Sequence, residues 1–307
     1  MADTPPERGR WASRPVPSQP RSIVELIRSG TLDAELAATI WLLLEGRVPL
    51  IVAGDGPADD RSTVLAALLD FVPRDVRVVE LAGADETFAW LPQASELGWP
   101  TAGQARANGP PLRPTGAMLL ATELSDLGPE TTWGEAARIA VRAASIGYGL
   151  AATMPAESLD DVFAELRAAP VRLTDDELSR LGVVLVVRRT DDERCRVVAA
   201  HYVRPVVRDV HGHLQRLGPA VLATWDERTD TLEQFGWGVA PELASRIGKR
   251  AGDFELELAA CRDLLERLAH DGATRVDDVR AAIAGHAALA TVQPTGLPLG
   301  SSTAAPH

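Results

Sequence analysis

The feature that most limits the fold of this 307-residue chain is a short apolar run, Val48 to Ala53, that leads directly into a Gly54-Asp55-Gly56 turn. The run is too short for an ordinary buried helix, and the glycines after it mark a sharp change of direction. A strand that is apolar on both faces is typical of a parallel sheet covered by helices. The pattern predicts a buried strand, a turn, and a helix that opens at Arg61-Ser62-Thr63.

The same alternation continues on both sides of this turn. Helices are predicted at Ile23 to Arg28, Leu32 to Leu44, Thr63 to Phe71, Trp133 to Ser145 and Leu159 to Ala168, and strands at Val76 to Leu81, Ala117 to Ala121, Leu150 to Thr153 and Val183 to Val187. Strands that alternate with helices indicate an α/β fold, in which a parallel sheet carries helices on both faces.

The pattern changes after Arg189. Strands are predicted at Arg196 to Val203, Ala220 to Thr224 and Thr229 to Trp237, and helices at Pro241 to Ile247, Phe254 to Ala269 and Val276 to Ala284. We therefore divide the chain into a core at 22–190 and an antiparallel strand insert with a small helical cap at 191–286. The tails, 1–21 and 287–307, hold too few large apolar residues to offset the entropy of ordering, so we expect them to be disordered.

Charge and cysteine content narrow the functional classes. A formal net charge of -12 argues against general affinity for nucleic acid or anionic membranes. Cys195 and Cys261 form neither a disulfide framework nor a zinc spacing, which favours a reducing cytoplasm. No run approaches the roughly 18 apolar residues of a membrane helix. We expect a cytoplasmic protein without a signal peptide, and leave peripheral attachment to the inner face of the cell membrane open.

Four segments, in this order and spacing, resemble the motor domain of the type II/type IV secretion ATPases, the family of the archaellum, Tad-pilus and type IV secretion motors. They are the lead-in at 22–37, the strand and helix at 147–163 that contain Thr153-Met154-Pro155-Ala156, the hairpin at 225–235, and the closing helices from Phe254 to His286. The resemblance covers about 22–286. It implies a RecA-like P-loop NTPase fold, ATP and Mg²⁺ as cofactors, and hexameric rings. The N-terminal domain usual in the family is not expected in this chain.

The resemblance places a phosphate-binding loop between Gly54 and Thr63. A working P-loop supplies backbone N–H groups, a lysine for the β- and γ-phosphates, and a Ser or Thr for Mg²⁺. Here Gly54 and Gly56 remain, Arg61 takes the lysine place, and Ser62 takes the hydroxyl place before Thr63. The segment is one residue longer than the family pattern.

Acidic residues crowd this loop. Asp60 takes the place of the last glycine, Asp55 and Asp59 lie nearby, and Pro57 removes one backbone donor. The single lysine, Lys249, lies far along the chain. Two like charges about 4 Å apart repel by roughly 4 kcal/mol at an effective dielectric near 20, so we expect the loop to reject a triphosphate. An aspartate capping the helix is the favoured structural reading, and a metal-bridged nucleotide is the alternative.

Of the other family positions, Glu123 is the best preserved. It follows the strand at Ala117 to Ala121 and matches the glutamate that activates water as a general base. A carboxylate at a strand end, solvated or paired with an arginine, is the alternative. Pro155 replaces the histidine of the family's histidine box and cannot titrate near neutrality.

The remaining candidates receive structural interpretations. Ala82 and Gly83 stand at the family's acidic pair, and Asp85 and Glu86 are expected to be solvated on the surface. The His211-Gly212-His213 turn has no third ligand nearby, so no metal site is predicted. Trp225, Phe235 and Trp237 are expected to pack in the core or in a hairpin, and the two cysteines to be small buried apolar groups.

Three functions stay open from the sequence. The first is a non-catalytic assembly or regulatory subunit of a secretion or pilus machine, whose partner would be an intact homologous ATPase or a platform protein, in a homo- or hetero-oligomer. The second is a weak ATPase that uses Arg61, Ser62 and Glu123. The third is an unrelated α/β module that binds a protein or a small molecule.

Overall fold

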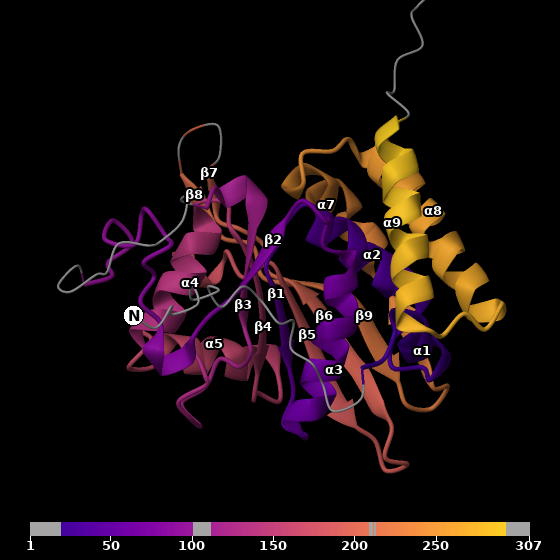
Figure 1. Ribbon diagram of the computed structural model, residues 1–307, viewed down its shortest axis with the longest axis horizontal. Helices are drawn as coiled ribbons and strands as arrows, with labels where there is room; N and C mark the ends of the chain where they lie inside the picture. The colour runs from indigo at the N-terminus through magenta and orange to yellow at the C-terminus, as the bar shows by residue number, and fades with distance from the viewer. Residues whose placement is uncertain (1–19, 101–111, 209–210, 212, 293–307) are drawn as a thin grey trace, which may run out of the picture.

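The computed structural model describes residues 20–100, 112–208, 211 and 213–292. The predicted tails fall largely outside these ranges, at 1–19 and 293–307. Within them the main feature is an eight-stranded sheet of order β10-β9-β6-β5-β1-β4-β3-β2 (Figure 1). The strands are β1 (Leu50–Ala53), β2 (Arg77–Glu80), β3 (Ala117–Ala121), β4 (Gly149–Met154), β5 (Val183–Arg189), β6 (Cys195–Tyr202), β9 (Ala220–Asp226) and β10 (Thr231–Gln234). A two-stranded ribbon, β7 (Val207–Arg208) with β8 (Leu214–Gln215), lies outside the sheet.

The direction of the strands confirms the predicted fold class. β5, β1, β4, β3 and β2 pair in parallel, and β6, β9 and β10 continue the sheet in antiparallel fashion. The central strand β1 leads into the glycine turn, which is the arrangement of a P-loop NTPase-like fold. The turn therefore lies at the carboxyl ends of the parallel strands, where ligands bind in open α/β sheets.

Helices cover both faces of the sheet. One face carries α1 (Ile23–Arg28), α2 (Ala34–Glu45), α3 (Ala58–Leu68), α7 (Ala240–Arg246), α8 (Ala251–His270) and α9 (Val276–Val292), and the other carries α4 (Glu135–Ser145), α5 (Leu159–Arg167) and α6 (Asp175–Leu178). Figure 1 shows α4 and α5 on the opposite side of the strands from α2, α8 and α9. Alternate residues of β1 enter the two cores, Leu50 and Val52 on one side and Ile51 and Ala53 on the other.

Local capping fixes the first two helices. Ser22 and Glu25 form a reciprocal capping box at the start of α1. Asp33 caps α2 by accepting a hydrogen bond from the Leu36 backbone N–H at 2.8 Å. The predicted helix at Ile23 to Arg28 is confirmed, and the predicted helix at Leu32 to Leu44 is confirmed to within two residues at each end.

The C-terminal part shares its core with the N-terminal helices. Tyr202 and Leu222, on β6 and β9, are buried in the same apolar cluster as Ile40 of α2 and Leu265 of α8. The boundary at 190 therefore does not coincide with an edge of this core. Helix α9 runs to Val292, beyond its predicted end at Ala284 and past the predicted tail boundary at 287. None of the helices in the described ranges is long and apolar enough to span a membrane.

Two aromatic predictions are wrong. Trp237 is 77% exposed and Phe235 is also exposed, because β10 ends at Gln234 and the chain turns into a short 3-10 helix, η4 (Gly236–Val239), that carries Trp237 outward. Trp225 is partly buried and packs in the β9–β10 hairpin, where its Nε1 donates to Asp230 Oδ1 at 3.1 Å.

The two cysteines differ in exposure, since Cys261 is buried and Cys195 is partly buried. Burial raises the pKa of each thiol to about 12, so both are protonated at neutral pH. Neither sulfur is a reactive thiolate, which fits the expected role as small apolar groups.

Candidate functional site

The glycine turn is shorter than the sequence pattern predicts. β1 ends at Ala53 and α3 begins at Ala58, so Arg61, Ser62 and Thr63 lie inside the helix rather than at its opening. Pro57 is the reason, since its φ of -52° suits the residue before a helix and it has no N–H to satisfy. The predicted helix start at Arg61 is therefore wrong.

Gly54 holds the turn against its neighbouring strands. Its backbone N–H donates to the Met154 carbonyl at the end of β4, at 3.1 Å. A Cβ at position 54 would lie 2.6 Å from the Val187 carbonyl oxygen of β5, so only glycine fits there. The turn is thus fixed between β4 and β5 and has little room to open.

The side chain that occupies the turn is Arg61. It is 4% exposed, and its Nη1 donates to the carbonyl oxygens of Gly54 at 2.7 Å and Gly56 at 2.6 Å. Its Nη2 donates to Glu123 Oε2 at 2.7 Å. The two glycines therefore present acceptors to the centre of the turn, whereas a phosphate cradle presents N–H donors. The centre of this turn is therefore occupied by a cation and its carbonyl acceptors.

Glu123 stands just after β3, and both of its carboxylate oxygens are engaged. Oε2 accepts from Arg61, and Oε1 accepts from Ser125 Oγ at 2.9 Å. The side chain is 13% exposed. This is the arginine-paired arrangement, one of the two structural alternatives for Glu123. Each carboxylate oxygen of Glu123 is therefore already engaged by one hydrogen bond from within the protein.

The aspartates do not fill the turn as the sequence suggested. Asp60 is held by Arg189 of β5, with Nη2 to Oδ1 at 2.8 Å and Nε to Oδ2 at 3.0 Å. Asp55 and Asp59 are exposed. No side chain caps α3, because its N-cap is Pro57 and the aspartates fall before or inside the first turn. The prediction of an aspartate cap is therefore wrong, and the charged group enclosed by the turn is a guanidinium.

Ser62 and Thr63 are not drawn into this cluster. Among the described residues neither hydroxyl makes a side-chain hydrogen bond, and successive residues of a helix point about 100° apart. Thr63 instead lines a small cavity of about 250 Å³ beside α1, together with Arg21 and Cys195. Of the predicted site residues, the structure brings together Gly54, Gly56, Arg61 and Glu123.

The segment at 82–86, where the family has its acidic pair, has a structural role that the sequence analysis missed. Glu86 is 8% exposed, not solvated as predicted. Its carboxylate accepts the backbone N–H groups of Ala82 at 2.9 Å and Phe88 at 2.6 Å, and the Trp90 indole N–H at 3.3 Å. Glu86 therefore organises the segment after β2, whereas Asp85 is exposed.

The segment Thr153 to Ala156, at the position of the family's histidine box, also links neighbouring strands of the sheet. Thr153 Oγ1 donates to the Thr122 carbonyl, so the end of β4 is tied to the end of β3 next to Glu123. Met154 accepts the hydrogen bond from Gly54 described above. Pro155 follows them and is partly buried. These contacts keep β1, β3 and β4 in register at the site.

The residues around the turn do not fit ATP and Mg²⁺. The two glycine carbonyls and the Glu123 carboxylate would face the phosphates, and both η nitrogens of Arg61 are already committed. Lys249 cannot serve in their place, since it is paired with Glu257 of α8. Within the described ranges, no group of three or more His, Cys, Asp or Glu side chains could hold a metal ion.

Comparisons with known proteins are limited. No protein-family model matches the chain. An uncharacterized protein of Methanocaldococcus jannaschii is 25% identical over 258 residues, which cover 81% of this chain and 45% of that relative. A second uncharacterized protein of the same organism is 28% identical over 168 residues, which cover 52% of this chain and 59% of that relative. The chain spans about half the length of the curated relatives it matches.

Two solved structures show a distant likeness. They are the VirB11 ATPase from the Brucella suis type IV secretion system in complex with sulphate, at 16% identity over 62% of this chain and 52% of that one with a TM-score of 0.33, and the Yersinia pseudotuberculosis ATPase DotB, at 12% identity over 87% and 63% with a TM-score of 0.32. TM-scores this low do not bear on fold or function, which rest here on strand order and side-chain contacts.

Proposed function

We propose that this chain is a degenerate secretion-type ATPase domain that does not hydrolyse ATP, and that it acts as an assembly or regulatory subunit of a type II/type IV secretion or Tad-like pilus machine. The observation that carries the first half of the proposal is the buried Arg61 guanidinium, held by Gly54, Gly56 and Glu123. An internal cation takes the central position of the turn, and three acceptors hold it there.

Binding of a triphosphate would have to break this arrangement. If ATP displaced Arg61, Glu123 would be left without its partner beside a polyanion, and removing one partner of a buried ion pair costs about 3–5 kcal/mol. If Arg61 stayed, the phosphates would meet the carbonyl oxygens of Gly54 and Gly56. Either route opposes binding, so we expect the site to remain closed to ATP.

Calorimetric titration of the purified chain with ATP, with and without Mg²⁺, tests this half of the proposal. We expect no binding in the micromolar range and no turnover above background in the wild type or in Glu123→Gln. The exposed neighbour Asp55→Asn serves as a matched control for a change of charge near the turn. Micromolar ATP affinity would contradict this half of the proposal, and turnover that disappears only in Glu123→Gln would establish a weak ATPase instead.

The sequence resemblance at 22–286 supports the link to a secretion or pilus machine. The segments that resemble the family are scaffold elements: α1 with α2, β4 with α5, the β9–β10 hairpin, and α8 with α9. These segments keep the family pattern, whereas the phosphate loop departs from it. This combination is expected of a subunit whose role depends on its fold rather than on ATP. Assembly partners of that kind include an intact homologous motor or a platform protein.

Gene neighbours and reconstitution test the second half. We expect adjacent genes for an intact secretion ATPase, a polytopic platform protein or pilins, and a complex with that ATPase in size-exclusion chromatography after co-expression. If the neighbouring genes have none of these and no complex forms, the chain is an unrelated α/β binding module. ATP binding is measured in a separate experiment. The claim about ATP and the claim about the secretion or pilus machine can therefore fail independently.

A further inference from the structure

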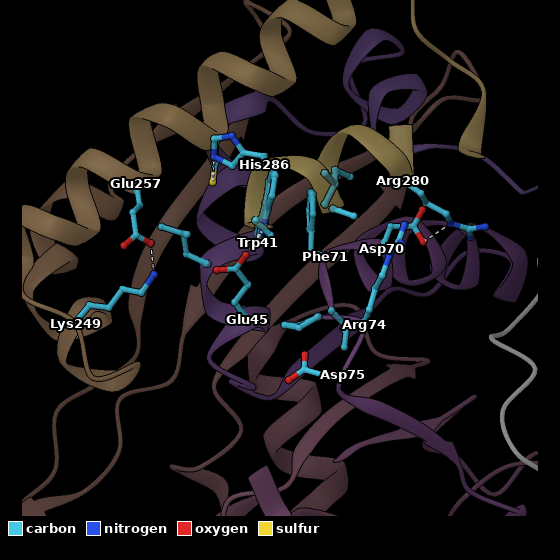
Figure 2. Close-up of a pocket in the computed structure, with 17 residues that line it drawn as sticks. Trp41, Glu45, Asp70, Phe71, Arg74, Asp75, Lys249, Glu257, Arg280 and His286 are labelled. Atoms are coloured by element: carbon cyan, nitrogen blue, oxygen red, sulfur yellow. Dashed lines mark hydrogen bonds and ion pairs between the residues drawn. The ribbon is translucent and has the colours of Figure 1, made fainter. Parts of the chain in front are cut away.

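A second site lies away from the glycine turn. A cavity of about 670 Å³ opens between α2, a 3-10 turn η1 (Leu69–Phe71), and the helices α8 and α9 (Figure 2). None of the residues 54–63 lines it. Its volume is within the range of about 300–1,000 Å³ found for small-molecule sites. The cavity is therefore large enough for a small-molecule ligand and is separate from the turn at residues 54–63.

The inner wall of the cavity is aromatic. Trp41 of α2 and Phe71 of η1 stack with ring centroids 5.0 Å apart and planes 9° from parallel. The His286 ring of α9 meets Trp41 edge-on, at 5.4 Å between centroids, and Cys261 of α8 lies beside His286. Figure 2 shows the Trp41, Phe71 and His286 rings grouped together. Trp41 and Phe71 are almost fully buried, so they give the cavity an apolar floor with little exposed ring surface.

Most charged groups in the cavity already have partners. Lys249 is paired with Glu257, and Arg280 of α9 is paired with Asp70 of η1 at 2.8 Å. Arg74 and Asp75, which carry opposite charges, are exposed. Exposed charges in water contribute little to the binding of an ion. Among the described residues that line the cavity, these pairs leave no buried cation open to an anionic ligand.

Glu45 is the exception. Its Oε1 accepts the Trp41 indole N–H at 2.7 Å, and among the described residues its Oε2 makes no hydrogen bond and no cation lies within 4.0 Å. Figure 2 shows this carboxylate between the Trp41 ring and the Lys249–Glu257 pair. Burial raises the pKa of Glu45, although the Trp41 hydrogen bond and the charge of Lys249 act in the opposite direction.

We propose that this cavity binds a small molecule with an aromatic or aliphatic body and a protonated amine, with the body in the apolar part of the cavity beside Ile283 and Ala284 and the ammonium group on Glu45. A half-buried carboxylate without an ion pair gains most from a ligand that brings its own positive charge. An anionic ligand would meet Glu45 with the wrong sign.

Three probes of similar size and different charge test the proposal: 2-phenylethylamine, neutral 2-phenylethanol and anionic 3-phenylpropionate. We expect calorimetry of the full chain at pH 7 to show the amine binding at least about tenfold more tightly than the alcohol, and the carboxylate most weakly. Glu45→Gln should abolish this preference, because the amide oxygen still accepts from Trp41 but carries no charge. Glu35→Gln, on the same helix but outside the cavity lining, should keep it.

A second variant checks where the amine sits. Ala284 lines the cavity from α9, and Ala284→Phe would fill part of it. We expect this variant to weaken amine binding at least about tenfold. The proposal is overturned if no probe binds at millimolar concentration, if amine and alcohol bind equally, if Glu45→Gln keeps the preference, or if Ala284→Phe leaves amine affinity unchanged.

Discussion

Arg61 Nη2 lies 2.7 Å from Glu123 Oε2, and this ion pair joins the start of α3 to the end of β3 across 62 positions of the chain. In a working P-loop protein these two elements would hold the phosphates and the general base. Here the side chains of Arg61 and Glu123, one from each element, pair with each other.

The first prediction concerns the stability that this ion pair provides. Arg61→Met should lower the free energy of unfolding by about 3–5 kcal/mol, because it leaves the Glu123 carboxylate buried without its cation. Urea denaturation followed by circular dichroism measures this loss. The double variant Arg61→Met/Glu123→Leu should recover much of the loss, since no buried charge remains. A single variant within about 1 kcal/mol of the wild type would contradict a structural role for the pair.

The second prediction is that restoring the motif will not restore binding. Asp60→Gly/Arg61→Lys recreates the glycine and lysine of the family pattern, yet the turn still has only Gly54 to Pro57 between β1 and α3. Its carbonyl oxygens, rather than N–H groups, still face the centre. We expect no calorimetric signal with ATP and Mg²⁺. Micromolar binding by this variant would contradict the proposal that the backbone of the turn excludes ATP.

The sequence predicts the elements well where each one carries its own signal. The helix at Ile23–Arg28 and the strand at Ala117–Ala121 match the prediction to the residue, because the first has a capping box and the second is a continuous apolar run. The short helix α6 and the ribbon of β7 and β8 escaped prediction, since two to four residues leave no periodicity to detect.

The start of α3 was misread for a different reason. Pro57 followed by Asp59 and Asp60 is an ordinary signal for a helix start, but the P-loop template places the helix opening at the lysine position. The pairing of Arg61 with Glu123 was beyond sequence analysis, because no local pattern links side chains so far apart in the chain. The burial of Glu86 was equally hidden, since it depends on N–H groups that only the folded turn brings together.

The third prediction tests Glu86 as an organiser of the segment after β2. Glu86→Ala would leave the N–H groups of Ala82 and Phe88 and the Trp90 indole without their acceptor. Hydrogen bonds to a charged group contribute about 1.5–3 kcal/mol each, so the variant should lose about 2 kcal/mol or more in urea denaturation. Its exposed neighbour serves as the control, and Asp85→Ala should change stability by less than about 0.5 kcal/mol. Equal effects of the two variants would contradict this role.

The fourth prediction follows from the raised pKa of Glu45. Because burial, the largest cause, lifts the pKa of this carboxyl in the folded state above its ordinary value of 4.5, the folded protein holds this proton more firmly than the unfolded chain does. The free energy of unfolding therefore falls as pH rises from the pKa of Glu45 in the unfolded chain to its pKa in the folded protein. Above the folded pKa, the ionised carboxylate destabilises the folded state by the full amount. A carboxylate that destabilises the folded state when it is ionised is better explained by a role in binding than by a structural role.

Glu45→Gln removes this ionisation and keeps an acceptor for Trp41 Nε1. The variant should therefore have a higher Tm than the wild type at pH 8, by a margin that shrinks as pH falls and vanishes near pH 4. Thermal unfolding across this pH range, at low salt and at about 1 M salt, measures the margin. The difference in Tm between the variant and the wild type should persist at high salt, because it arises from burial of the carboxylate rather than from surface charges. A margin that is constant with pH, or a variant less stable at pH 8, would show that burial does not oppose the charge on Glu45.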